Sequence, residues 1–233
     1  MPWCGALCSL QTTAARHFIH ALEPSNQNLL GNAALLLEQL GRLDEAVALD
    51  EYVAARDPVN PIGHFNLGLK YRYVGRLDDA INSFDIALSL SPEYLGAEYH
   101  RALALLRKGE PRLALEGFRR ERDEEYRVKG TALALYELDR LSEFEKAFSE
   151  LRERWGEQWG AEIAHVYAWI GDPDETFTYL ENVYEDGSPM AQLSSDDLFA
   201  NIHDDPRWPP FLEKIGQAPK QLEAIEFMVT LPK

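Results

Sequence analysis

The sequence repeats itself with a period of 34 residues, and this period limits the fold more than any other feature does. The segment GRLDEA at Gly41–Ala46 recurs as GRLDDA at Gly75–Ala80. A proline, Pro58 or Pro92, stands 12 residues after the alanine in each case. The glycine and the alanine recur once more at a further 34 residues. A fixed period of this length predicts a stack of similar supersecondary units.

The best-preserved unit, Pro61–Tyr94, indicates how each repeat folds. Its small and apolar residues follow one another in steps of three and four, which is the spacing of one helix face. They form two runs: Leu67, Gly68 and Tyr71, then Ala80, Phe84 and Ala87. Gly75 separates the two runs. Because glycine suits a helix end with positive φ, each unit is predicted to be a helix, a short turn and a second helix.

At these places the sequence resembles a tetratricopeptide repeat (TPR), a family of helix pairs with this period. The family has small residues at places 8 and 20, an aromatic at place 24 and a proline at place 32. In this unit those places hold Gly68, Ala80, Phe84 and Pro92. The resemblance implies an all-α fold: a right-handed superhelical solenoid of antiparallel helix pairs, with about five repeats and a C-terminal capping segment.

The resemblance also divides the chain into three parts. An irregular N-terminus at 1–11 is followed by a TPR array at 12–186 and by a C-terminal cap and tail at 187–233. The predicted repeats are a partial one at about 12–26 and then 27–60, 61–94, 95–126, 127–156 and 157–186. Asp50 stands at the aromatic place of the repeat at 27–60, and Asp139 stands at the glycine place of the repeat at 127–156.

Residues 196–216, which follow the array, read DDLFANIHDDPRWPPFLEKIG. This segment is similar to one found after TPR arrays in bacterial multidomain regulators, where a DNA-binding or nucleotide-cyclase domain often precedes the array. Since a terminal repeat exposes an apolar edge, we expect Leu198, Phe199, Trp208 and their apolar neighbours to cover the last helix pair. The array begins in the middle of a repeat, so either the first helix is degenerate or the chain is the C-terminal part of a longer protein, and we expect the second.

The resemblance implies that the first helices of the pairs line a concave groove, where a protein or peptide partner binds. The predicted groove residues are Phe65, Leu69, Arg72, Tyr73, Tyr99, Arg107, Lys129, Tyr136, His165 and Trp169. Aromatic side chains with a few cations are typical of a surface that binds a protein ligand. The alternative is that several of these aromatics pack between adjacent repeats.

Charge excludes some classes of partner and suggests another. The chain has 39 Asp and Glu against 23 Lys and Arg, so it repels phosphate and is not expected to bind nucleic acid or an anionic membrane directly. Nine basic residues against six acidic ones lie between Arg101 and Lys129, whereas Trp155–Pro206 contains twelve acidic residues and no Lys or Arg. These runs predict solvated helix faces; the alternative is weak self-association between the basic middle and the acidic C-terminal third of a second copy.

The sequence lacks the usual signatures of catalysis. It has neither a glycine-rich phosphate loop nor a Gly-x-Ser-x-Gly elbow, so no enzyme activity and no cofactor are predicted. His17 with His20, and His203 with its two following aspartates, are interpreted as surface or capping residues, and no metal site is predicted. An enzyme would need a deep pocket with converging polar groups at the junction with the C-terminal segment.

The function predicted from the sequence is a non-catalytic protein–protein interaction module that binds its partner in the concave groove. The alternative is the sensory or regulatory C-terminal half of a larger bacterial transcription regulator or nucleotide cyclase. The only two cysteines lie within the first ten residues, and no stretch approaches the roughly 20 apolar residues of a membrane span. A cytoplasmic location is therefore expected.

Overall fold

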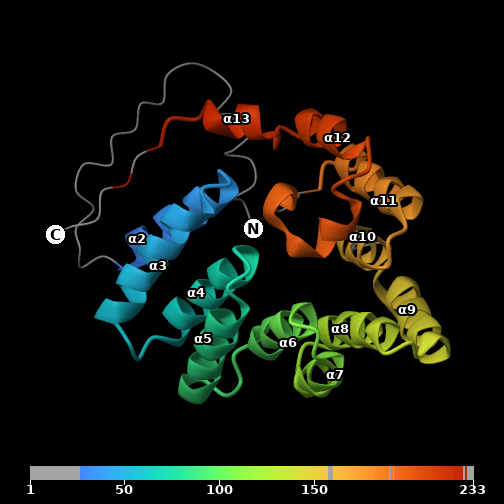
Figure 1. The fold of residues 1–233 in the computed structure, drawn as a ribbon, viewed down its shortest axis with the longest axis horizontal. Coiled ribbons are helices and arrows are strands. Elements are labelled where there is room, and N and C mark those ends of the chain that lie inside the picture. The colour runs from blue at the N-terminus through green and yellow to red at the C-terminus, as the bar shows by residue number, and fades with distance from the viewer. Residues whose placement is uncertain (1–26, 157–159, 189, 191, 228, 230–233) are drawn as a thin grey trace.

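The computed structural model describes residues 27–156, 160–188, 190, 192–227 and 229, which form helices arranged in a ring (Figure 1). Consecutive helices pair in antiparallel fashion: α2 (Gln27–Gln39) with α3 (Leu43–Arg56), α4 (Pro61–Tyr73) with α5 (Leu77–Leu90), α6 (Ala97–Arg107) with α7 (Pro111–Arg120), α8 (Glu124–Glu137) with α9 (Leu141–Trp155), and α10 (Gly160–Trp169) with α11 (Pro173–Glu185). The predicted all-α solenoid is confirmed. The expected N-terminus at 1–11 and partial repeat at 12–26 lie outside the described residues.

The turn inside each pair is made by a residue with left-handed backbone geometry. Gly75, between α4 and α5, has φ +77°, and the glycines at the corresponding turns of three other pairs have φ between +71° and +83°. Between α8 and α9 the residue is Asp139, with φ +56°. Aspartate tolerates this region better than most residues because its short polar side chain can interact locally. The turn between the two helices is therefore set by local chemistry.

Close approach of the paired helices depends on small residues facing aromatic ones. A Cβ atom added to Gly68 on α4 would lie 2.7 Å from the ring of Phe84 on α5, so only glycine fits there. Phe84 and Ala80 are fully buried in the same contact. Equivalent contacts recur along the array, and they merge into a buried cluster that runs from α6 to α10. Each pair thus buries its apolar faces against its neighbours, as a solenoid requires.

The residues after the array form a cap built of short elements: η1 (Leu193–Ser195), η2 (Asp197–Ile202), α12 (Trp208–Lys214) and α13 (Pro219–Glu223). Their apolar side chains pack on Ala164 of α10 and on Phe177 and Leu180 of α11. The cap residues in this cluster are Leu193, Phe199, Ile202, Trp208, Phe211 and Leu212. The cap therefore covers the edge that the last pair would otherwise expose.

The same C-terminal segment closes the ring, which the sequence did not predict. In Figure 1, η1 and η2 turn into the centre of the ring, and α13 lies close to α2 and α3. Phe227 is 7% exposed and belongs to the same buried cluster as Leu30 and Leu37 of α2. Arg42 donates a hydrogen bond to the carbonyl oxygen of Phe227.

Within the described residues, none of the helices has both the length and the apolar character that a membrane span requires.

Candidate functional site: the concave face and its central cavity

The predicted groove residues fall into two groups in the structure. Five of them are between 2% and 9% exposed: Arg72, Tyr99, Lys129, His165 and Trp169. The other five are half-buried or exposed: Phe65, Leu69, Tyr73, Arg107 and Tyr136. The first group is covered because the C-terminal cap lies against the concave ends of α4 and α10, and because charged side chains of neighbouring helices pair with one another.

A chain of buried ion pairs links η2 to the array. Asp197 pairs with Arg72 on α4, and both side chains are at most 9% exposed. Asp196 accepts a hydrogen bond of 3.0 Å from Nε2 of His165 on α10. This contact fixes the start of η2 on the concave face. The cationic groove residues therefore already hold carboxylates of the same chain.

The chain of charges continues from His165 toward α8. His165 Nδ1 donates to Glu162 across 3.2 Å, and Glu162 also pairs with Lys129. Burial alone would lower the pKa of His165, but the carboxylates of Asp196 and Glu162 raise it to about 9. The pKa of Asp196 is lowered to about 2, because His165 outweighs the effect of burial. Both ring nitrogens of His165 are therefore protonated at neutral pH, and cations and anions alternate along this series of ion pairs.

The aromatic groove residues are largely engaged within the array. The Tyr99 ring stacks on Tyr126 of α8 at a centroid distance of 4.7 Å, so Tyr99 packs between adjacent repeats. Trp169 donates its indole N–H to Glu137 across 2.9 Å, and its carbonyl accepts a hydrogen bond from Asn201 of η2. Tyr136 keeps part of its surface exposed. Whether Tyr136 contacts a partner stays a prediction.

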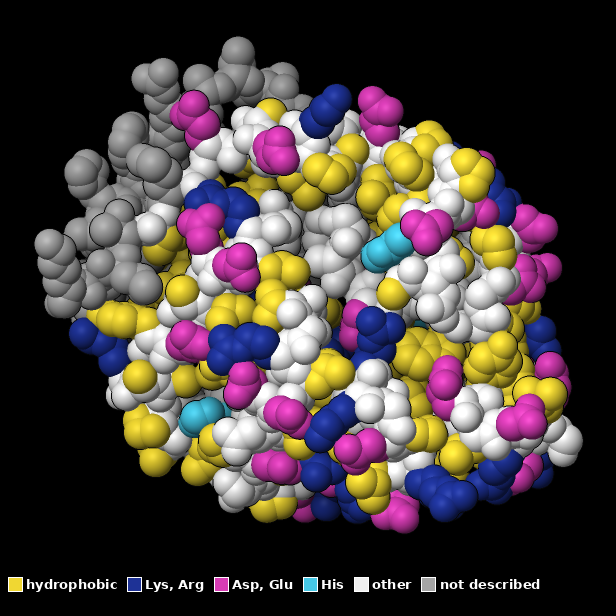
Figure 2. All heavy atoms as spheres, in the orientation of Figure 1, with side chains coloured by type: hydrophobic (Ala, Val, Ile, Leu, Met, Phe, Trp, Pro, Cys, Tyr) yellow, Lys and Arg dark blue, Asp and Glu magenta, His cyan; other side chains and the backbone are white. Residues whose placement is uncertain are grey.

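A cavity of about 610 Å³ remains at the centre of the ring. It lies between the α2–α3 turn, the C-terminal ends of α4 and α6, the η1–η2 segment and α13. Two predicted groove residues, Tyr73 and Arg107, line it together with Asp197, Ser195 and His203 of the cap. Figure 2 shows the face of the molecule that is hollowed near the centre of the ring.

The cap residues of the cavity were not predicted as site residues. Their signal in the sequence was the pair Asp196–Asp197 directly before the apolar Leu198 and Phe199, because two adjacent acids are costly to bury without cationic partners. Arg72 and His165, both predicted to face the groove, are those partners. Charge complementarity between the two acids of the cap and the basic residues of the concave face could therefore have predicted that this part of the cap packs on the concave face.

The chemistry of the cavity suits binding. In the part of the chain that the structure describes, neither Ser194 nor Ser195 hydrogen-bonds to His203, so no serine nucleophile is activated by an adjacent base. His203 stacks on Trp208 at 5.0 Å instead. No group of three or more His, Cys, Asp and Glu residues is placed to hold a metal ion within the described ranges. Mixed apolar and polar walls of this size are typical of a ligand pocket.

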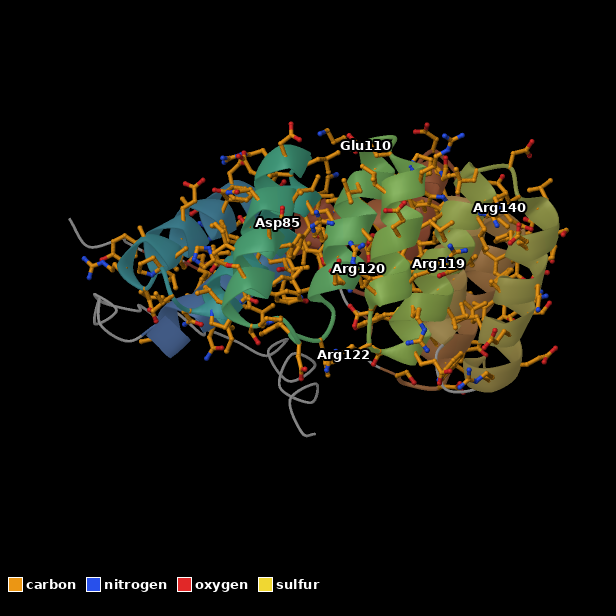
Figure 3. The ribbon with its side chains drawn as sticks, turned by 90° about the horizontal axis from the view of Figure 1, so that it is seen from below. Asp85, Glu110, Arg119, Arg120, Arg122 and Arg140 are labelled. Carbon is orange, nitrogen blue, oxygen red and sulfur yellow. The ribbon has the colours of Figure 1, made fainter. Side chains whose placement is uncertain are left out.

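The basic middle of the chain lies largely on the outer side of the array. Figure 3 shows Arg119 and Arg120 on α7 and Arg122 just after it. Arg120 pairs with Glu98 at 3.1 Å and Arg122 pairs with Glu93 at 2.7 Å. Lys129 of the same run pairs with Glu162 of the acidic third within one chain. Internal pairing therefore uses much of the charge that self-association would need, and self-association stays a prediction.

A second group of buried charges lies between α2, α3 and α4. Asp50 and Lys70 are each 3% exposed and Glu38 is 9% exposed. Lys70 forms an ion pair with Glu38, and its charge also acts on the nearby carboxyl group of Asp50. Burial, opposed by Lys70 and reinforced by Glu38, raises the pKa of Asp50 to about 7. Asp50, which stands at the aromatic place of the repeat at 27–60, therefore has a carboxyl group that stays protonated over much of the acidic pH range.

Comparison with known proteins agrees with this architecture. A relative among curated proteins, cell division cycle protein 27 homolog A of Arabidopsis thaliana, is 33% identical over 91 residues, which are 37% of this chain and only 13% of that protein. A tetratricopeptide repeat protein from Parabacteroides merdae has a similar structure, with a TM-score of 0.55 at 20% identity, covering 88% of this chain and 82% of that one. MamA from Desulfovibrio magneticus matches with a TM-score of 0.51 at 18% identity, covering 69% and 94%.

These two structural matches establish similarity of fold alone. The tetratricopeptide repeat family model matches residues 6–61 and 65–126, which together are half of the chain. The chain therefore belongs to the tetratricopeptide repeat family.

Proposed function

We propose that this protein is a non-catalytic interaction module that binds a protein or peptide partner on its concave face, at the central cavity. Membership of a family of interaction scaffolds supports the general role. The location rests on one observation: the cap fills much of the concave face but leaves a cavity of about 610 Å³ beside Tyr73 and Arg107. Those two side chains are an aromatic and an arginine, the types that most often anchor a protein ligand.

The cap also limits how a partner binds. Asp196 and Asp197 hold η2 against α4 and α10, so a partner cannot follow the concave face along its whole length without displacing this segment. Displacement would expose Phe199 and Ile202, which are at most 2% exposed. Because exposing large apolar side chains is costly, the cap stays in place and the partner binds beside it.

Co-purification with substituted modules tests this proposal. The intact chain and the variants Tyr73→Ala, Arg107→Gln, Tyr136→Ala and Arg119→Gln are immobilised and incubated with lysate of the source organism. Captured proteins are then identified by mass spectrometry. We expect Tyr73→Ala and Arg107→Gln to lose a partner that the other two variants keep, since Arg119 lies on the outer side of α7 (Figure 3). Retention of every partner by both cavity variants would contradict the proposal.

The regulatory alternative, in which the chain controls an attached DNA-binding or cyclase domain, stays a prediction. The two hypotheses share a structure, and they differ in whether an effector domain precedes this segment in the polypeptide. In the regulatory case the captured protein would be the effector domain of the same polypeptide.

A further inference from the structure

We propose that the C-terminal tail is exchanged between copies of this chain, so that the tail of a second copy binds the surface that the chain's own tail covers here. The tail is the segment around Phe227 and Val229. The tail site is the apolar surface of α2 and α3 under it, together with Arg42 of the turn between them. This inference goes beyond the proposed function, which concerns the cavity beside Tyr73 and Arg107.

Two apolar side chains anchor the tail. Phe227 is buried in the cluster of α2 and α3, and Val229 packs against the same cluster. Side chains two residues apart point to the same side of an extended segment, so a short stretch of chain suffices for both contacts. The apolar residues of α2, its following turn and α3 in this cluster include Leu30, Leu37, Leu40, Leu49 and Val53. The anchor is therefore small, and it lies at the far end of the chain.

The tail site also recognises the main chain of the tail. Nη1 of Arg42 donates to the carbonyl oxygen of Phe227. Nε and Nη2 of Arg42 donate to the two carboxylate oxygens of Glu45, both across 2.6 Å. Because Glu45 belongs to α3, it holds the guanidinium group in position independently of the tail. The donor is therefore already oriented for a main-chain carbonyl, whichever copy supplies it.

An exposed arm connects the tail to the body of the cap. The body ends at Gln217, whose side-chain oxygen accepts a hydrogen bond of 2.8 Å from the N–H of Leu193. After it, α13 has no buried residue, and residues 219–226 are exposed apart from the half-buried Leu222. Gln221 donates to the carbonyl oxygen of Glu213, a contact within the cap itself. Release of the tail therefore frees the arm without unpacking a buried helix.

The arm is long enough to reach a second molecule, since residues 218–226 span up to about 30 Å when extended. Exchange between two copies replaces each tail by an identical one, so both tail sites stay filled and the anchoring contacts are conserved. Such reciprocal exchange produces a closed pair with twofold symmetry at low cost. A second copy is the occupant that the structure supports, because the site fits this tail and every copy carries it.

Concentration decides whether a tail site holds its own tail or that of another copy. A tail on a short flexible arm competes for its own site at an effective concentration in the millimolar range. We therefore expect the natural chain to be monomeric at about 10 µM and to form pairs as its concentration approaches about 1 mM.

A tail peptide tests whether the tail site accepts a tail from another molecule. The probe is a fluorescein-labelled peptide of residues 222–229, and its control is the same peptide with Phe227→Ala. Fluorescence polarisation is measured on the full natural chain and on the full-length variants Phe227→Ala, Val229→Ala and Ile225→Ala. Ile225 is the matched control position, because it lies on the same arm and is exposed.

We expect Phe227→Ala to bind the peptide at least about tenfold more tightly than the natural chain or Ile225→Ala, because its own tail no longer competes. Val229→Ala should give an intermediate affinity, and it keeps the test decisive if Phe227→Ala does not fold. Adding Arg42→Gln to Phe227→Ala should weaken binding, since the donor to the main chain is lost. The control peptide should bind to none of these proteins. Circular dichroism and urea unfolding verify that each variant is folded.

Oligomeric state tests the exchange itself. Size-exclusion chromatography with light scattering is run on the natural chain, Ile225→Ala and Phe227→Ala at concentrations from about 10 µM to about 1 mM. We expect a dimer fraction that rises with concentration for the first two proteins, and a monomer throughout for Phe227→Ala.

Equal peptide binding by the natural chain and a folded Phe227→Ala variant, or no binding by either at millimolar concentration, overturns the inference. Dimers that persist in Phe227→Ala also overturn it, because they would form through another surface. Peptide binding without dimers of the natural chain would contradict exchange between copies, and would assign the tail site to ring closure or to a segment of a different protein. Capture that depends on Tyr73 tests the proposed function separately, so the two proposals fail independently.

Discussion

Replacing Asp50 by asparagine should stabilise the protein in a pH-dependent manner. Asp50 is 3% exposed on α3, and its Oδ2 has no hydrogen-bond partner among the described residues. In the folded state burial raises the pKa of this carboxyl from 3.8 to about 7. Asparagine has nearly the same shape and carries no charge at any pH. The difference between the two proteins therefore isolates the cost of ionising one buried carboxyl group.

The magnitude follows from the linkage between protonation and folding. A folded-state pKa raised above the unfolded value means that the folded protein holds the proton more tightly, so stability is lost as pH rises from about 4 through 7 and is constant above. Each tenfold change in proton affinity corresponds to 1.36 kcal/mol, so the full effect is about 4 kcal/mol. Between pH 5 and pH 8 the stability of Asp50→Asn relative to the natural chain should rise by about 3 kcal/mol.

Urea unfolding followed by circular dichroism at half-unit pH steps from 4 to 8.5 measures this difference. Asp44→Asn is the matched control, because Asp44 lies on the same helix and is exposed. The pH dependence of Asp50→Asn is compared with that of this control. A difference for Asp50→Asn that stays constant within about 0.5 kcal/mol over the whole range would refute the reasoning, since it would show that the buried carboxyl ionises as easily as an exposed one.

Three further predictions concern packing, charge and ring closure. Gly130→Ala should lower the free energy of unfolding by about 1–3 kcal/mol in urea, because the added Cβ would overlap the buried ring of Phe118. The stability of the natural chain relative to His165→Gln should fall by about 3 kcal/mol between pH 6 and pH 9.5. The reason is that Asp196 and Glu162 raise the pKa of His165 to about 9, and the stabilisation from these ion pairs is lost as His165 deprotonates. Phe227→Ala should cost about 3–5 kcal/mol and speed hydrogen exchange in α2, and unchanged exchange there would show that the ring is not held by this contact.

Much of the fold could be predicted because its determinants lie close together in the sequence. Gly68 and Phe84, which fix the spacing of α4 and α5, are 16 residues apart, and the same pairing of a small residue with an aromatic one recurs as Ala102 and Phe118. The turn at Asp139 follows from the place it occupies in the repeat, since a left-handed backbone is required there. The cap, too, could be assigned to the last pair, because its apolar residues have a predictable exposed edge to cover.

The site could be predicted only in part. Tyr73 and Arg107 were identified as groove residues and do line a cavity. Tyr99 was predicted to face the same groove, yet it stacks on Tyr126 and is 2% exposed. The difference arises because periodicity indicates which side of a helix a residue lies on, and not whether a neighbouring side chain then covers it.

The sequence by itself determined the helix pairs, their turns and the order of the repeats, because each of these depends on residues within one 34-residue period. Tertiary structure alone decided what the concave face offers to a partner. Arg72 meets Asp197 across 125 positions of sequence, and Phe227 returns to α2 from the far end of the chain. Such contacts depend on how far the superhelix curves and on where the cap then lies. The curvature accumulates over all the repeats, so the sequence of a single repeat does not specify it.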